Sequence, residues 1–258
     1  MFKEVIKYRD LLFMLTLRDI RIRYKQAAMG FLWAIFMPIV AILAGIIVKK
    51  VMAVMSGKPI DSSGILAIAI KVIPWTFFVS SIKFSVQSLV GNANLVTKIY
   101  FPREVLPLAS IFACLFDLLI AGIALAVILI FTHIGATVYL LWLPVLLIFL
   151  VLFTAGLGLF LASANLFYRD IKYVVEIILM FGIFFTPVFY DANMFGNWQT
   201  LLLINPIGSI LEAINSIVIL HKMPNTFWLA YAGITSFAVF ILGMEVFHKS
   251  EPLFAENI

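Results

Sequence analysis

Long apolar runs separated by short polar segments dominate this chain of 258 residues. Runs with few or no charges predict membrane-spanning helices near residues 28–55, 65–90, 105–131, 139–166, 172–189 and 226–246. The third and fourth spans are divided at residues 133–137, because the uncharged stretch 132–167 is too long for one ordinary crossing. The pattern therefore predicts an all-α polytopic membrane protein with six transmembrane helices.

Two further apolar pieces, near residues 198–204 and 207–220, are separated by Asn205-Pro206. A helix rises about 1.5 Å per residue, so pieces of up to about 14 residues cover only half of a hydrocarbon core about 30 Å thick. We therefore expect a re-entrant extracellular helical hairpin between spans 5 and 6. Irregular backbone at this depth is tolerated only where protein or a water-filled cavity satisfies its polar groups.

Residues 1–27 predict an N-terminal amphipathic interface helix, because apolar and basic positions fall on different helical stripes. The apolar stripe consists of Phe2, Ile6, Phe13, Leu17, Ile20 and Tyr24, and the basic stripe of Lys7, Arg18, Arg21 and Lys25. Such a helix places apolar side chains at the headgroup boundary and cations against anionic membrane lipids. It serves either as a topology anchor alone or also as a docking site for a partner.

Composition favours a single transmembrane domain over residues 1–258. Hydrophobic residues make up 64% of the chain, charged residues 12%, and the mean hydropathy is +1.13, which is too apolar for one soluble core. The membrane region 28–246 leaves only the interface helix and a cytoplasmic tail at 247–258. The first apolar run is too long for the core of a cleavable signal peptide, so we expect it to remain as a span.

The distribution of Lys and Arg predicts the orientation. Thirteen of the 18 lie on the side of the N-terminus, the connections after spans 2 and 4, and the tail, whereas five lie on the opposite side. The positive-inside rule therefore places both termini in the cytoplasm. The formal net charge of +5 arises beside apolar runs, which favours orientation in a bilayer over nucleic-acid binding.

The polar, basic segment 92–104 lies between spans 2 and 3 and therefore predicts a cytoplasmic loop that touches a partner protein. Gly91 and Pro102 bracket a short piece capable of forming a helix, with Asn92 or Asn94 available as its N-cap. A short rigid helix would transmit the movement of a partner to spans 2 and 3. The alternative is an ordinary charged turn.

Polar residues within the spans are the next candidates for function, because a charge at a helix centre costs at least about 2.5 kcal/mol unless it is paired or wet. Asp117 lies about 12 residues into span 3, near mid-bilayer by this count. An interhelical hydrogen bond is favoured over a proton relay, since His133 and His221 both fall at the outer edge. Arg169 and Asp170 are interpreted as a local ion pair that ends span 4.

No phosphate-binding loop of the form Gly-x-x-x-x-Gly-Lys-Ser/Thr is present, and no segment is long enough for a soluble ATPase domain. No paired metal-ligand spacing such as His-Glu-x-x-His occurs either. We therefore expect no catalytic, metal or cofactor site in this chain. Any use of ATP would depend on a partner.

Several motifs along nearly the whole chain resemble type-two ABC exporter permeases, in particular the polysaccharide-export branch that includes O-antigen and teichoic-acid exporters. The segments that carry this resemblance are 8–12, 18–25, 30–33 with Pro38, 94–103 with Leu106-Pro107, 165–170, 186–190, Asn205-Pro206 and 251–256. Each is weak alone, but together they occur in the expected order and spacing. One departure is Asn215, where members often carry an arginine.

The resemblance implies a homodimeric permease in the bacterial inner membrane that binds two ABC nucleotide-binding subunits, which hold ATP and Mg²⁺, on its cytoplasmic side. The implied substrate is a lipid-linked polysaccharide. Residues placed to couple to the ATPase are Arg18, Arg21, Lys25, Asn94, Lys98 and Arg103. The family builds its pore from spans 1 and 5, so the aromatic residues expected to line the pathway are Trp33, Phe36, Phe185, Phe189 and Tyr190.

Aromatic side chains suit a polymer path, because sugar rings stack on them without fixed hydroxyl geometry. Ordinary packing and interfacial belts explain many aromatics equally well. Two other functions remain open. The same architecture exports a drug or small lipid in some relatives, and an ion-gradient transporter or intramembrane enzyme is a further class. The absence of clustered acidic or His residues at mid-membrane argues against the latter.

Overall fold

The computed structural model describes residues 7–25, 29–56, 62–132, 135 and 137–254, and these residues form helices and turns without a strand. The α-helices are α2 (Arg9–Tyr24), α3 (Trp33–Ser56), α4 (Ser62–Gly91), α5 (Ala93–Lys98), α6 (Val105–Phe131), α7 (Leu143–Phe167), α8 (Ile171–Gly182), α9 (Gln199–Ile204), α10 (Pro206–Val218) and α11 (Thr226–Ser250). Short 3-10 turns are η1 (Gly30–Leu32), η2 (Val138–Trp142), η3 (Ala192–Trp198) and η4 (Glu251–Leu253). The predicted stripe residues Phe2 and Ile6 and the last four tail positions lie outside the described residues.

Among the described residues, five helices are long and apolar enough to cross a membrane. They are Gly30–Val51, Gly64–Gly91, Val105–Phe131, Val138–Phe167 and Thr226–Leu253, close to five of the six expected spans. The exception is 172–189, which contains the 12-residue α8 followed by a turn-rich segment at 183–190. The all-α polytopic class is confirmed, whereas a sixth long helix is not observed.

Helix α4 forms the centre of the bundle. It packs against α6, α7, α3, α10 and α8, and most of its apolar window is buried. Its buried side chains include Ile68, Val72, Ile82 and Val86, which join one large hydrophobic core. Because α4 is surrounded by protein, it is apolar around most of its circumference rather than along one stripe.

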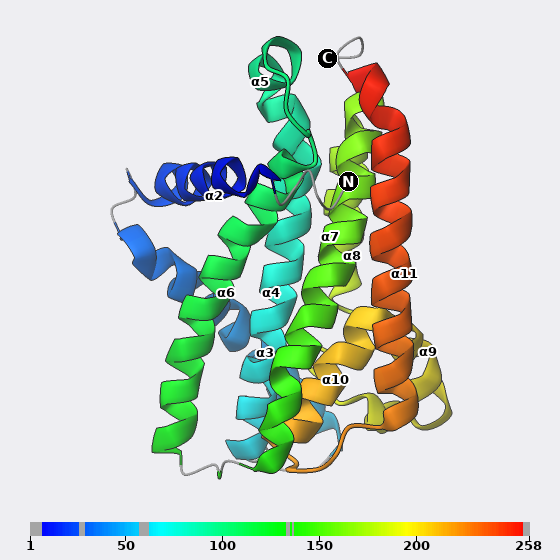
Figure 1. Ribbon diagram of the computed structural model, residues 1–258. Coiled ribbons are helices and arrows are strands. Elements are labelled where there is room, and N and C mark those ends of the chain that lie inside the picture. Colours follow the sequence, from blue (N-terminus) through cyan, green and yellow to red (C-terminus); the bar gives the residue numbers. More distant parts are fainter. Residues whose placement is uncertain (1–6, 26–28, 57–61, 133–134, 136, 255–258) are drawn as a thin grey trace.

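The two ends of the bundle carry different elements (Figure 1). Helix α5 and the end of α11 lie at one end, and the α9–α10 pair lies at the other. Helix α2 lies across the long helices and packs on α6. The two short helices expected around Asn205-Pro206 are therefore present, at the end of the bundle opposite α5, whereas their re-entrant position in a membrane stays a prediction.

Local polar contacts explain the hairpin. Asn205 caps α10 by accepting a hydrogen bond from the Ile207 N–H at 3.1 Å, and Pro206 occupies the first helical position. The Asn205 side chain also donates to Thr186 Oγ1 at 2.9 Å. A hydrogen bond between Asn205 and Thr186 therefore links the Asn-Pro motif to the Thr-Pro motif.

Helices α7 and α11 approach closely at two glycines. A Cβ added to Gly243 would overlap the Gly156 carbonyl oxygen, and a Cβ added to Gly156 would overlap the backbone at Phe240. No flexible side chain can move aside there, because the obstructing atoms are backbone. The pair therefore needs glycine for space rather than for backbone conformation.

We expect Gly243→Ala to push α7 and α11 apart and lower stability by about 1–3 kcal/mol, as overpacking does. Thermal unfolding of the purified protein in detergent measures the change. Gly122→Ala is the matched control, because no atom lies within 4 Å of the added Cβ. Equal melting temperatures for the two variants would contradict the close-packing interpretation.

Candidate functional site

Helix α5 presents a short polar and aromatic surface. Val96 is buried under it, while Asn94 and Lys98 are exposed and Tyr100, just after the helix, is 97% exposed. Asn92 occupies the N-cap position, but its side chain donates to the Ser88 carbonyl at 2.8 Å instead of capping α5. This bond ties α5 directly to the end of α4, so the helix is anchored on one face and open on the other.

Arg103 differs from the other residues expected to couple to an ATPase, because its side chain turns toward the protein. Its Nη1 donates to the Glu251 carbonyl at 2.6 Å, its Nη2 donates to the Val96 carbonyl at 3.3 Å, and its backbone N–H donates to Glu251 Oε1 at 3.2 Å. Arg103 therefore joins α5 to the segment that follows α11.

The tail is also held by an aromatic anchor. Phe254 is fully buried, with its ring 5.0 Å from that of Phe247 and 6.1 Å from that of Phe167, centroid to centroid. Val96, Phe101 and Phe254 belong to one hydrophobic cluster. We call the contacts of Arg103, Glu251 and Phe254 the tail brace. It gives α5 support that its six residues alone do not provide.

Helix α2 turns one mixed face toward α6. Ile20 is buried, and Asp19 accepts a hydrogen bond from Ser110 at 3.2 Å while pairing with Arg18 at 2.9 Å. Arg21 and Lys25 are exposed. The expected apolar stripe is divided, because Ile20 packs inward whereas Phe13 is exposed.

Asp117 receives its partners from the last turn of α2. Arg23 Nη1 lies 2.9 Å from Asp117 Oδ2, and the Tyr24 hydroxyl donates to Asp117 Oδ1 at 2.5 Å. The Arg23 guanidinium also lies 3.9 Å from the centre of the Phe84 ring and donates to Cys114 Sγ at 3.4 Å. Burial and the bond to Asp117 raise the pKa of Tyr24, so the hydroxyl keeps its proton at neutral pH.

The aromatic residues expected in the pathway occupy different environments. Trp33 and Phe36 form an edge-to-face pair at 5.4 Å, and Phe36 is exposed. Phe185 is 71% exposed, whereas Phe189 is 7% exposed and packs against Gly45 of α3. The Tyr190 ring is tilted against that of Phe195 at 4.9 Å, centroid to centroid, and its hydroxyl donates to the Phe184 carbonyl at 2.7 Å. Phe36 and Phe185 are thus open to a neighbour, and Phe189 is a core residue of this chain.

Arg169 and Asp170 lie at the turn between α7 and α8. Both are exposed, and the local ion pair expected between them is not observed. The buried polar residue of segment 165–170 is Asn165, which donates to the Val86 carbonyl at 3.0 Å and accepts from the Lys172 N–H at 3.1 Å. Asn165 therefore fixes the start of α8 against α4.

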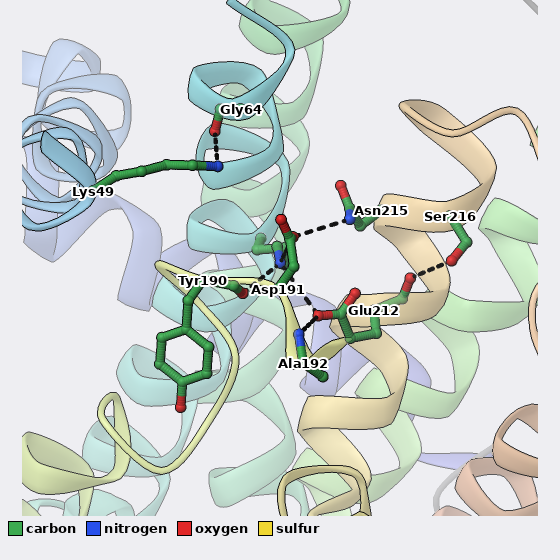
Figure 2. A network of polar contacts seen from close by, with 9 residues as sticks. Lys49, Gly64, Tyr190, Asp191, Ala192, Glu212, Asn215 and Ser216 are labelled. Atoms are coloured by element: carbon green, nitrogen blue, oxygen red, sulfur yellow. Dashed lines mark hydrogen bonds and ion pairs between the residues drawn. The ribbon is translucent and has the colours of Figure 1, made fainter. Parts of the chain in front are cut away.

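A buried lysine lies near the opposite end of the bundle. Lys71 of α4 is 1% exposed and donates to Asp191 Oδ1 at 2.8 Å, to the Tyr190 carbonyl at 2.7 Å and to Glu212 Oε1 at 3.4 Å. Figure 2 shows Asp191 and Glu212 converging from the 190–192 turn and from α10. We call these residues the Lys71 network.

Further bonds complete the Lys71 network. Glu212 Oε1 accepts from the Ala192 N–H at 2.6 Å, and Asn215 donates to Asp191 Oδ1 at 3.4 Å. Burial opposes ionisation of Asp191, but the Lys71 ammonium offsets it and holds the pKa of Asp191 below its usual value. Asp191 is therefore charged at neutral pH and forms an ion pair with Lys71.

The sequence did not predict this network, because Lys71 entered the argument only as one of the five Lys and Arg residues on the side opposite the N-terminus. The available signal was a lysine seven residues inside a long apolar helix, Gly64–Gly91, with the carboxylates of Asp191 and Glu212 in the connection that faces it. No group of three or more His, Cys, Asp or Glu in the described part of the chain is arranged to hold a metal ion.

Comparison with known proteins adds a family and several relatives. The profile of the ABC-2 type transporter family matches residues 10–219. O-antigen export system permease protein RfbA of Klebsiella pneumoniae is 30% identical over 258 residues, covering 96% of this chain and 94% of the relative. A second RfbA from that organism is 29% identical with the same coverage. RfbA of Myxococcus xanthus is 25% identical, covering 99% of this chain and 98% of the relative.

We expect Arg23→Gln to loosen α2 from α6, because it removes a hydrogen-bonded charge partner worth about 1.5–3 kcal/mol. Thermal unfolding and protease cleavage of α2 measure the loss. The double variant Arg23→Gln with Asp117→Asn should recover most of it, since no unpaired carboxylate remains. Arg21→Gln, at an exposed position, is the matched control, and an equal loss in that variant would refute the assignment.

We expect Phe254→Ala to release the tail brace and lower stability by about 3–5 kcal/mol, the range for buried Phe→Ala changes. The melting temperature of the purified protein and protease cleavage near α5 are the measurements. Leu253→Ala is the adjacent control, because Leu253 is 49% exposed. Equal melting temperatures and equal cleavage near α5 in the two variants would show that the tail brace contributes nothing.

Proposed function

Because the chain belongs to the ABC-2 type transporter family, we propose that it is the permease subunit of an ATP-driven exporter of lipid-linked polysaccharide in the bacterial inner membrane. The observation that carries this proposal is similarity along nearly the full length to an O-antigen export system permease, covering 96% of this chain and 94% of that protein. The proposed polymer is therefore O-antigen-like.

Energy would come from two copies of a separate nucleotide-binding subunit, which hold ATP and Mg²⁺. The chain has no phosphate-binding loop, so the partner must supply hydrolysis. The exposed side of α5 suits docking, because Lys98 and Tyr100 extend from a helix that Val96 and the tail brace hold in place. Arg21 and Lys25 of α2 add an exposed basic surface at the same end.

A second copy of this chain would complete the pathway. The outward face of α8 is apolar and open at Ile177, Ile178 and Phe181, and Phe185 in the segment after the helix is also exposed. Segment 183–190 then leaves the helix, and irregular backbone facing lipid tails is unfavourable. A homodimer that joins the α8 face and the exposed face of α3, including Phe36, would cover this segment and enclose an aromatic-lined path for the polymer.

The proposed orientation places α2, α5 and the tail in the cytoplasm. The positive-inside rule supports it, because 13 of 18 Lys and Arg residues fall on that side. The α9–α10 hairpin would then lie at the outer side as a re-entrant element. Its buried backbone ends, capped by Asn205, suit a position surrounded by protein.

The substrate is tested by deleting the gene in a bacterium that displays this polysaccharide. We expect surface polymer to disappear and lipid-linked polymer to accumulate inside the cell, because synthesis continues without export. Immunoblots of intact and lysed cells measure both pools, and the reintroduced wild-type gene is the control. Unchanged surface polymer after deletion would reject polysaccharide export.

The docking surface is tested by Lys98→Ala and Tyr100→Ala in the co-expressed complex. We expect less nucleotide-binding subunit to co-purify and less ATPase activity per permease, with the melting temperature of the permease unchanged because both side chains are exposed. The exposed residue Tyr139 of η2, at the opposite end of the bundle, gives the control Tyr139→Ala. Wild-type assembly of the Lys98 and Tyr100 variants would exclude this surface.

A further inference from the structure

We propose that the Lys71 network fastens the outer helical hairpin to α4, so that α4 carries movements of α5 through the membrane to the hairpin. The proposal rests on the function proposed above and deepens it by naming the contact that links ATP hydrolysis to the outer side. Lys71 is a positioning residue in this scheme, because it acts through the hairpin rather than on the polymer.

One continuous helix connects the two sites. Helix α4 ends at Gly91, and α5 begins at Ala93, with only Asn92 between them. Asn92 bridges the junction: its N–H donates to the Leu89 carbonyl at 3.1 Å, and its carbonyl accepts from Leu95 at 2.9 Å and Val96 at 3.1 Å. A push on α5 therefore reaches α4 directly.

The far end of this helix carries Lys71, twenty residues before Gly91. At about 1.5 Å per residue the separation is about 30 Å, the thickness of the hydrocarbon core. Pro74 removes one backbone hydrogen bond near Lys71, but Trp75, Phe77 and Phe78 are buried against the core. Packing keeps the two parts of α4 together at that point.

Lys71 forms hydrogen bonds with both segments at the outer end of the bundle. It binds the Tyr190 carbonyl and Asp191 in the segment after α8, and Glu212 in α10. Glu212 in turn binds the Ala192 N–H, so the two segments are also joined to each other. Movement of α4 is therefore passed to the end of the α8 segment and to the hairpin together.

The ion pairs of Lys71 oppose separation of α4 from Asp191 and Glu212. Lys71 is 1% exposed, so separating it from Asp191 and Glu212 would leave an unpaired ammonium in an apolar core. Apolar side chains would hold two helices equally well without that penalty. An ion-paired joint differs because it resists sliding, since any shift would separate the buried Lys71 ammonium from its carboxylate partners. We therefore expect the hairpin and α4 to move as one body.

The test places a single reactive thiol in η3, the turn that leads directly into α9 of the hairpin, in the complete complex. Asn197 is exposed in η3, and the native Cys114 is buried, so Asn197→Cys can be labelled with a membrane-impermeant maleimide. Labelling rates are compared for the complex without nucleotide and with ATP and vanadate. We expect the rate to differ between the two states, and identical rates would overturn the proposal.

The network is then removed in the Asn197→Cys background. Lys71→Met alone leaves two unpaired carboxylates, so the triple variant Lys71→Met, Asp191→Asn and Glu212→Gln supplies a neutral joint. We expect the triple variant to assemble and hydrolyse ATP but to lose the nucleotide-dependent difference in labelling, together with export. Lys83→Met, an exposed lysine of the same helix, is the matched control and should keep both.

A triple variant that keeps the nucleotide-dependent difference would show that the network only stabilises the fold. Failure of the triple variant to assemble would be resolved by Glu212→Gln alone, which retains an acceptor for Ala192 but weakens the grip on Lys71. An unaltered response in that variant would also overturn the proposal. If the Asn197→Cys parent itself forms no ATP-hydrolysing complex, the proposed function fails first, and this outcome is distinct from loss of the labelling difference.

Discussion

Backbone N–H and C=O groups that have no hydrogen bond within a helix need another hydrogen-bond partner, and that requirement shapes the bundle. Where α8 ends, the Thr186 hydroxyl donates to the Gly182 carbonyl, the Tyr190 hydroxyl to the Phe184 carbonyl, and Lys71 to the Tyr190 carbonyl. Where α9 ends, Tyr231 donates to the Ile204 carbonyl at 2.7 Å. Single polar side chains thus make short helices and turns possible among long apolar ones.

Two partly buried charge clusters have related roles in different parts of the bundle. Arg23 and Asp117 hold α2 against α6, and the Lys71 network holds the α9–α10 hairpin against α4. In both clusters a peripheral element is attached to a long helix by an ion pair with additional hydrogen bonds. Apolar packing alone is non-directional, whereas these pairs define one position for each element.

Much of the fold follows from local sequence. Residues 105–131 form a helix with those bounds, because an apolar run with a single charge, Asp117, is bracketed by polar residues at both ends. The early end of α8 at Gly182 does not follow, since the apolar run continues to Phe189. Likewise Asp117 was identifiable as a costly charge, but its partners Arg23 and Tyr24 are more than ninety residues away. Pairings across such separations depend on packing that no local pattern encodes.

The tail brace has a consequence for biosynthesis. Residues Glu251 and Phe254, which support α5, lie at the end of the last candidate span and are therefore translated after α2 to α11. A nascent chain in which α4 and α5 have already been synthesised therefore still lacks the tail-brace contacts that support its proposed docking surface. In the proposed complex, an ATPase subunit that requires a braced α5 would associate with finished permeases and leave incomplete ones unoccupied, so the order of synthesis itself acts as a checkpoint on assembly.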